Sequence, residues 1–267
     1  MPLGTTITGA APVWVGDRLR EKTHQGEVVH VGSDAIYFRS RDDVIGVVSR
    51  RATPIPCTIS TILPTLDGQF STSGNPQTGD IVTIGDGVAM ISGTEVHVAR
   101  LVDFQMPAIA PEHIQTMRTR LGEIAGESLQ SAEIPAEVLE ILRANPSEAV
   151  PLLLGRGSGL TPFGDDVVCG TLATLLTFDD PCAAPLRATA LELAPDRTTS
   201  LSATLIRRAA EGDVLPVFAN AVTALAYHPE KATENINRLL SIGHTSGAGM
   251  LLGFSVALDH ITMRSCS

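Results

Sequence analysis

The stretch that decides the fold of the first part of the chain is GDIVTIGDGVAMISGTEVHVARLVDF, residues 79–104. In it, short runs rich in Val and Ile alternate with turn formers at residues 85–87 and 92–93. This pattern is typical of a β-meander, in which alternate side chains face the core. The side chains that we predict to face inward are Ile81, Val88, Ile91 and Val96.

A second stretch of the same kind, GEVVHVGSDAIYFRSRDDVIGVVS, covers residues 26–49. Residues 53–77 lie between the two stretches, contain four prolines and show no strong period, so we interpret them as a long excursion. Several short strands at this spacing favour a small barrel or a curled sheet. We therefore predict β structure over residues 12–104, within a β-rich domain of residues 1–106.

The period of the sequence changes after Pro107 and Pro111. Alanine becomes frequent and apolar residues recur at helical spacing. The predicted helices cover residues 112–129, 136–144, 165–178, 184–193, 200–210, 214–226, 230–240 and 247–261. Strands and helices are thus segregated, which disfavours a Rossmann-type sheet and predicts an α+β protein with an α-helical domain at residues 107–267.

Composition restricts the class of protein. The chain has 267 residues, of which 43% are hydrophobic and 18% charged, a balance typical of a folded globular protein rather than a disordered one. Its net charge of −10 and the lack of a clustered basic face argue against nucleic acid as a partner.

The expected location is the cytoplasm. The longest apolar runs, residues 167–178 and 248–258, are shorter than the ~20 residues that cross a bilayer, and residues 1–14 lack the features of a signal peptide. We therefore expect no membrane association. The four cysteines form no C-x-x-C pair, as expected of reduced thiols. They are Cys57, Cys169, Cys182 and Cys266.

The most informative loop is GRGSGLTPFGDD, residues 155–166, which has four glycines in ten residues and precedes a predicted helix. Glycine permits positive φ angles and close approach to a ligand, and a helix N-terminus suits an anion. The predicted anion-binding residues of this loop are Arg156, Gly157, Ser158, Gly159, Thr161 and Gly164. The alternative is a tight connection in which Asp165 only caps the next helix.

Two further loops also precede predicted helices. GHTSGAGMLLG, residues 243–253, repeats the six-residue glycine step of residues 164–170, which indicates either a pseudo-repeat facing one ligand or chance recurrence of small residues. DRTTS, residues 196–200, adds hydroxyls that either cap a helix or bind an anion. The predicted anion-binding residues here are Thr245, Ser246 and Gly247, with Arg197, Thr198 and Thr199. We expect the three loops to meet in space.

Three residues in these loops are candidate catalytic groups. Asp165 and Asp166 are adjacent, and His244 lies in a glycine-rich corner where it either acts as general acid or base or braces the loop. The other six histidines have no recognisable chemical neighbourhood. A divalent cation at the Asp165–Asp166 pair is conceivable, but two ligands do not define a metal site, so we expect no metal and no cofactor.

The segments GRGSGLTPFGDDVVCGTLATL, TTSLSATLIRRAAEGDVLPVF and LLSIGHTSGAGMLLG, in this order, resemble a bacterial family that includes the AllH subunit of oxamate carbamoyltransferase, an enzyme of allantoin and purine catabolism. The resemblance extends over roughly residues 26–258. It implies transfer of a carbamoyl group between oxalurate or oxamate and phosphate or carbamoyl phosphate. It also implies AllF-like and AllG-like partner subunits.

This chain departs from the family pattern at two positions. The family loops read approximately GLTPSGDD, TT-x-x-S and GH-S-SG-x-D, whereas Phe163 and Gly249 stand here in place of Ser and Asp. Two alternatives to a catalytic subunit therefore stay open. One is a non-catalytic subunit for small-anion binding or assembly, and the other is a metal-assisted ureide hydrolase that uses Asp165 and Asp166.

Overall fold

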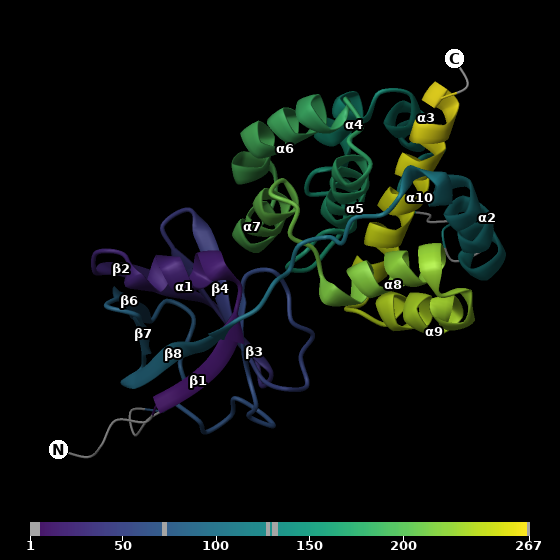
Figure 1. The fold of residues 1–267 in the computed structure, drawn as a ribbon. Coiled ribbons are helices and arrows are strands. Elements are labelled where there is room, and N and C mark those ends of the chain that lie inside the picture. Colours follow the sequence, from purple (N-terminus) through teal and green to yellow (C-terminus); the bar gives the residue numbers. More distant parts are fainter. Residues whose placement is uncertain (1–5, 71–73, 127–128, 130–132, 266–267) are drawn as a thin grey trace. The chain divides into compact units, whose positions relative to one another are not determined.

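The chain divides into two compact units, Met1–Phe104 and Gln105–Ser267, in this computed structural model (Figure 1). The structure describes residues 6–70, 74–126, 129 and 133–265. The first unit is a closed barrel of eight strands and the second is helical, so the predicted α+β class and the order of the two parts are confirmed. Within the described residues, no helix has both the length and the apolar character needed to cross a bilayer.

The barrel closes through pairing of its first and last strands. Its strands are β1 (Thr6–Ala11), β2 (His24–Val31), β3 (Ala35–Ser40), β4 (Asp43–Val48), β5 (Thr58–Thr61), β6 (Ile81–Gly85), β7 (Val88–Ile91) and β8 (Thr94–Leu101). Their order around the barrel is β1-β5-β4-β3-β2-β6-β7-β8. The β1–β8 and β4–β5 pairs are parallel and the other neighbours antiparallel. Closure leaves no free sheet edge.

The barrel core confirms part of the predicted inward-facing set and corrects the rest. Ile91 and Val96 are fully buried, as expected, whereas Val88 is half-buried and Ile81 is 59% exposed. The prediction for Ile81 is wrong because side chains alternate along a strand, so that burial of the next residue turns Ile81 outward. The buried positions of β6 and β7 that the prediction missed are Val82, Ile84 and Ala89.

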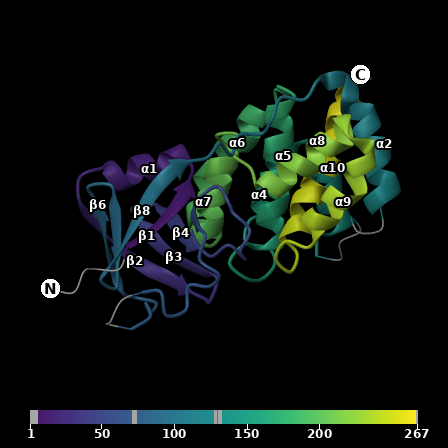
Figure 2. The same ribbon diagram turned by 60° about the horizontal axis from the view of Figure 1, so that its bottom comes forward.

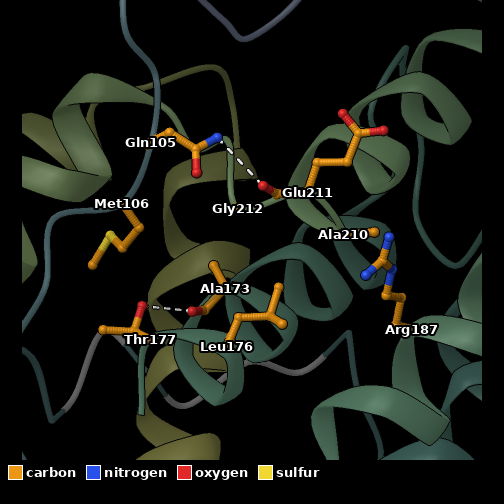
Figure 3. Close-up of a pocket in the computed structure, with 9 residues that line it drawn as sticks. All are labelled: Gln105, Met106, Ala173, Leu176, Thr177, Arg187, Ala210, Glu211 and Gly212. Carbon is orange, nitrogen blue, oxygen red and sulfur yellow. Dashed lines mark hydrogen bonds between the residues drawn. The ribbon is translucent and has the colours of Figure 1, made fainter. Parts of the chain in front are cut away.

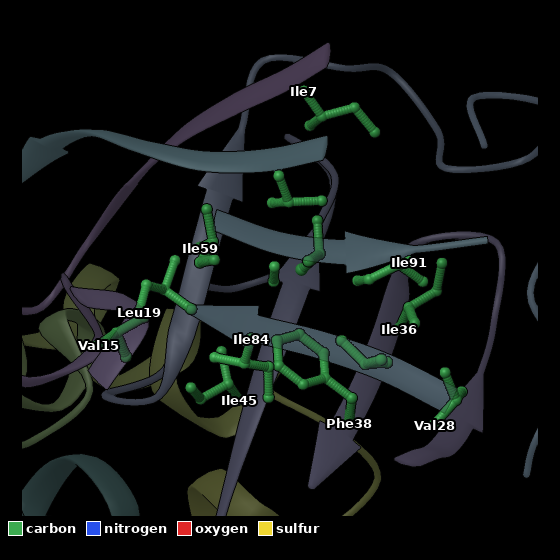
Figure 4. Close-up of a cluster of buried hydrophobic side chains, with 14 of the residues drawn as sticks. Ile7, Val15, Leu19, Val28, Ile36, Phe38, Ile45, Ile59, Ile84 and Ile91 are labelled. Carbon is green, nitrogen blue, oxygen red and sulfur yellow. The ribbon is translucent and has the colours of Figure 1, made fainter. Parts of the chain in front are cut away.

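Two elements in this unit differ from the sequence prediction. Helix α1 (Val13–Arg20) lies in a stretch predicted as β structure, and its Val15 and Leu19, four residues apart, join the buried barrel cluster (Figure 4). Strand β5 lies within the predicted excursion, where its four residues are too few to show a period. Helix α1 follows from packing against the barrel and strand β5 from pairing with β1 and β4, rather than from local pattern.

In its described residues, the second unit has helices as its regular elements, with one isolated β-bridge between Gln105 and Asp213. Its elements are the 3₁₀ turn η1 (Pro111–His113), α2 (Ile114–Ala125), α3 (Ala136–Ala144), α4 (Pro146–Leu153), α5 (Phe163–Thr177), α6 (Ala183–Arg197), α7 (Ser200–Ala209), α8 (Pro216–Tyr227), α9 (Pro229–Leu240) and α10 (Ser246–Ser265). Each predicted helix has a counterpart. The end of the first predicted helix, at residues 127 and 128, falls outside the described residues, and α4 was not predicted.

Helices α5 and α10 pack along each other at the centre of the second unit (Figures 1 and 2). Residues Phe163–Leu175 of α5 are all buried, as expected of a helix that is covered on every side. Glycines bring the two backbones close together: a Cβ on Gly170 would lie 2.1 Å from the Met250 carbonyl oxygen, and one on Gly253 would lie 2.2 Å from that of Val167. This packing brings the first turns of α5 and α10 together.

Candidate functional site

Hydroxyl groups join the three glycine- and threonine-containing loops at the start of α5. Thr161 Oγ1 lies 2.8 Å from Ser246 Oγ, which links the first loop to the start of α10. Thr199 Oγ1 donates to the Leu160 carbonyl oxygen at 2.5 Å, and Thr198 Oγ1 donates to Asp165. The loops at residues 155–166, 196–200 and 243–249 therefore meet, as their sequences predicted.

The first loop turns on glycines in the left-handed region. The φ angles of Gly155, Gly157 and Gly159 are +73°, +113° and +91°, which other residues adopt only with strain. The Gly164 N–H donates to the Arg156 carbonyl oxygen at 2.8 Å and closes the loop. Gly155 also passes so close to Arg197 that a Cβ would lie 2.2 Å from its carbonyl oxygen.

The sequence predicted that backbone N–H groups at the start of α5 bind an anion, but these groups donate to carbonyl oxygens of the protein instead. The Asp165 and Asp166 N–H groups donate to the Pro162 carbonyl oxygen at 3.0 and 3.3 Å, and the Gly164 N–H is used in the loop. Neither Gly164 nor Gly247 has a positive φ. A Cβ on either would instead meet a carbonyl oxygen, that of Leu153 at 2.1 Å or of Leu239 at 1.8 Å. Packing therefore explains both glycines without a ligand.

Asp165 connects the loops instead of capping its helix, because the N-cap of α5 is Pro162, with no side-chain cap. Its carboxylate is buried, and it accepts hydrogen bonds from the Gly155 N–H at 2.8 Å and from the Thr198 and Ser202 hydroxyls. Burial raises the pKa of Asp165, while these hydrogen bonds oppose the rise. Asp165 is thus fully engaged in holding the loops together.

Asp166 differs from its neighbour in having an open oxygen. The residue is 6% exposed, and its Oδ2 has no hydrogen-bond partner among the described residues. Burial raises the pKa of Asp166 well above its usual range, the nearby Asp165 charge raises it further, and the Ser246 hydroxyl opposes the rise. A carboxyl group in this environment favours its protonated form and is able to donate a proton.

The remaining predicted site residues are more exposed than the two aspartates. Gly157, Ser158, Gly159, Arg156, Arg197 and His244 are exposed, whereas Thr161, Thr198, Thr199, Thr245 and Ser246 are half-buried. The Arg156 guanidinium donates to the Glu133 carbonyl oxygen at 3.2 Å, while that of Arg197 has no partner within the described part of the chain. His244 makes no hydrogen bond to either aspartate in that same part.

Sequence reasoning missed Ser202, whose hydroxyl hydrogen-bonds Asp165. A signal was present, because Ser202 is the last position of the TT-x-x-S spacing that begins at Thr198. On a helix that begins at Ser200, Ser202 lies in the first turn beside the cap residue Thr199, whose Oγ1 accepts from the Ser202 N–H at 3.0 Å. The same turn therefore supplies both the helix cap and a donor to the acid pair.

A separate cavity of about 470 Å³ lies at the other end of α5 (Figure 3). It is lined by Gln105, Met106, Ala173, Leu176, Thr177, Arg187, Ala210, Glu211 and Gly212. Thr177 lies eleven residues beyond Asp166 on α5, roughly 16 Å along the helix axis. This cavity is therefore distinct from the acid pair.

The fold and the site define a two-unit α+β protein whose helical unit carries a buried carboxylate pair beneath a glycine-rich loop. Residues 153–258 match the family model described as oxamate carbamoyltransferase subunit AllH. The matched segment lies within the helical unit and contains all three loops, so the resemblance to the AllH family is confirmed over these residues. No solved structure was found to match the chain.

Proposed function

We propose that this chain is a subunit of an oxamate carbamoyltransferase and that the three loops around Asp166 form its substrate site. The observation that carries this proposal is the open Oδ2 atom of Asp166, which is buried where the loops meet. Burying a carboxyl oxygen without a partner is costly, and such groups concentrate at functional sites. The AllH match over residues 153–258 supports the class of reaction.

The chemistry that we propose needs a proton donor at the leaving group. When phosphate attacks the carbamoyl carbon of oxalurate, a C–O bond forms and the C–N bond to the oxamate nitrogen breaks. That nitrogen leaves as an amide only if it gains a proton, which neutral Asp166 would donate. The proton lost by the attacking hydrogenphosphate would restore neutral Asp166, and in the reverse direction the Asp166 carboxylate would accept the proton from the amide. Asp165 would act as a positioning residue through Gly155 and Thr198.

The groups around Asp166 suit a small anionic substrate. Arg156 and Arg197 are exposed cations in two of the loops, and a guanidinium binds carboxylate or phosphate through paired hydrogen bonds. The hydroxyls of Thr161 and Ser246 hydrogen-bond each other, and Ser246 also hydrogen-bonds Asp166, so these two groups hold the acid in place beside the cations. We assign the carboxylate of oxamate or oxalurate, and the phosphate of the second substrate, to Arg156 and Arg197, and His244 to a supporting acid–base role.

AllF-like and AllG-like chains are the partners that we propose for the complete enzyme. The family name itself describes a subunit. The cations and His244 lie at exposed positions, where a partner surface would exclude water from the reacting groups. We place the complex in the cytoplasm and in ureide catabolism.

The competing candidate is a non-catalytic anion-binding or assembly subunit, and one observation favours it. A Cβ on Gly249 would lie 2.8 Å from Asp166 Cβ and 3.4 Å from Phe163 Cδ2, so the two departures from the family pattern face each other beside the acid. An aromatic ring and a glycine thus stand where the family has a hydroxyl and a carboxylate. The metal-assisted hydrolase is less favoured, because Asp165 uses both oxygens in hydrogen bonds.

The test is an assay of the assembled complex. The chain would be co-expressed with AllF-like and AllG-like partners, and carbamoyl phosphate formed from oxalurate and phosphate would be measured. We expect Asp166→Asn to lower the rate on the order of 100-fold, the contribution of a general acid, while Asp196→Asn, at an exposed position in the third loop, leaves it unchanged. An Asp166→Asn complex with the parent's rate would exclude the proposed role. An assembled but inactive parent complex that binds oxamate would favour the assembly candidate.

A further inference from the structure

Three side chains of metal-ligating type meet far from the acid pair, where the connection between α5 and α6 passes α10. They are Asp180, Cys182 and His260, and their ligand atoms all lie within 4.8 Å of one another. His260 Nε2 lies 3.7 Å from Asp180 Oδ1. Donor atoms in a tetrahedral zinc site lie roughly 3.5 Å apart, given bonds of about 2.0–2.3 Å. We propose that this cluster binds Zn²⁺ or a chemically similar divalent transition-metal ion.

The imidazole of His260 is held in the orientation of a metal ligand. Its Nδ1 lies 2.6 Å from the Arg143 carbonyl oxygen, and because a carbonyl only accepts hydrogen bonds, Nδ1 carries the proton. In the neutral imidazole, Nε2 therefore has a free lone pair. That atom is buried, in a residue 2% exposed, and has no hydrogen-bond partner among the residues described. Proteins commonly fix metal-bound histidines through such a bond at the other ring nitrogen.

Asp180 and Cys182 supply the remaining donors from one short turn. Asp180 Oδ1 accepts from the Cys182 backbone N–H at 2.8 Å, which holds the two residues together at the start of α6. A carboxylate and a thiolate together would balance the charge of a divalent ion, and the mixed O, S and N donor set suits zinc. Three protein ligands leave one position for water. A cavity of about 420 Å³, lined in part by Asp180 and Pro181, adjoins the site.

The Arg264 side chain places a positive charge beside Asp180 and Cys182. Its Nη1 lies 2.9 Å from Cys182 Sγ and 3.4 Å from Asp180 Oδ1. The side chain is 46% exposed and belongs to the last turn of α10, so it is able to rotate toward solvent when a cation binds. Arg264 and the metal therefore compete for the same two ligands. A metal site and a plain ion-pair cluster therefore predict different effects of removing the Arg264 charge.

The test is titration of the full-length chain, treated with EDTA and dialysed, with Co²⁺ as a spectroscopic probe for Zn²⁺. We expect one equivalent to produce the near-ultraviolet charge-transfer band of a cobalt–thiolate bond, and Zn²⁺ to displace it. Cys182→Ala should abolish the band. Cys57→Ala is the matched control, because Cys57 is a buried cysteine of the barrel unit. Arg264→Gln should bind Co²⁺ about tenfold more tightly, since a charge-assisted contact no longer competes.

Cys182 is only half-buried, so its alanine variant is expected to fold and the comparison stays interpretable. A parent chain without the thiolate band, or a band that persists in folded Cys182→Ala, would overturn the site. An Arg264→Gln variant that binds Co²⁺ no more tightly than the parent would overturn the competition. None of these outcomes depends on the proposed transferase activity, because the readout is metal binding alone.

Discussion

Asp165 and Asp166 are neighbours in sequence with different roles. Asp165 accepts hydrogen bonds from one backbone N–H and two hydroxyls, so its carboxylate is compensated by donors. Asp166 keeps one oxygen without a partner and has the more strongly raised pKa. Protonation is therefore favoured on Asp166 over Asp165. Two neighbouring carboxyl groups whose pKa values differ in this way provide one structural anion and one acid.

The raised pKa of Asp166 makes the stability of the helical unit depend on pH. Above its ordinary value of 3.8, the folded carboxyl binds more protons than the unfolded one, so the free energy of unfolding falls as pH rises. We expect this fall to begin above about pH 4 in the parent and to be smaller in Asp166→Asn. Urea unfolding followed by circular dichroism at several pH values measures it. Asp196→Asn should keep the parental slope, and parallel profiles for the parent and Asp166→Asn would contradict the expectation.

Phe163 and Gly249 are coupled through the space beside Asp166. A Cβ at position 249 would approach the Phe163 ring at 3.4 Å and the Phe163 carbonyl oxygen at 2.9 Å. We expect Gly249→Asp alone to destabilise the helical unit, and Phe163→Ser to relieve part of that cost by removing the ring. A double-mutant cycle in urea should give a favourable coupling of about 1 kcal/mol. Strict additivity of the two substitutions would show that each position varies independently.

At the scale of elements, the crossing of α5 and α10 depends on glycines. A Cβ on Gly170 would lie 2.1 Å from the Met250 carbonyl oxygen, so Gly170→Ala must push two backbones apart. We expect it to lower the free energy of unfolding by about 1–3 kcal/mol, the usual cost of overpacking. Gly122→Ala in α2 is the control, because nothing lies within 4 Å of its Cβ position. That variant should gain about 0.5–1 kcal/mol from helix propensity. Equal stability of the two variants in urea would contradict the packing role.

The elements show which features local sequence determines. Apolar period and glycine or proline boundaries predicted α5, α7 and α10 within a few residues. Local pattern failed at α1, whose valines resemble a strand, and at α4, which contains two prolines. In β6, Ile81 and Val82 are equally apolar, and the alternation with Thr83 is the local signal that Val82 and Ile84 face inward.

The candidate site was predictable to a similar extent. Glycine content and hydroxyls before helices predicted that three loops meet. Which aspartate keeps an open oxygen depends on donors from a different helix, such as Ser202, and no local spacing records that choice. The Asp180–Cys182–His260 cluster joins residues about 80 positions apart, so no motif connects them.

At the scale of the whole molecule, each unit contains its own core. The barrel buries its cluster within residues 7–96 (Figure 4). Its described strands form a closed sheet, which leaves no strand edge for another element to cover. The helical unit buries α5 against α4, α6, α7 and α10, all within Gln105–Ser267. The AllH match is confined to that second unit. The residues that we assign to the candidate site all lie in this second unit.

We therefore expect residues 105–267 to fold without the barrel. The expressed fragment should show the circular dichroism of a helical protein and a cooperative urea transition, because α5 keeps every helix that covers it. A shorter fragment, residues 105–240, is the control. It ends with α9 and lacks α10, so one whole side of the apolar α5 would be exposed to water, and we expect it to aggregate or remain unfolded. If residues 105–267 fail to fold while the full chain folds, the helical core requires the barrel, and the domain boundary near residue 105 loses its physical meaning.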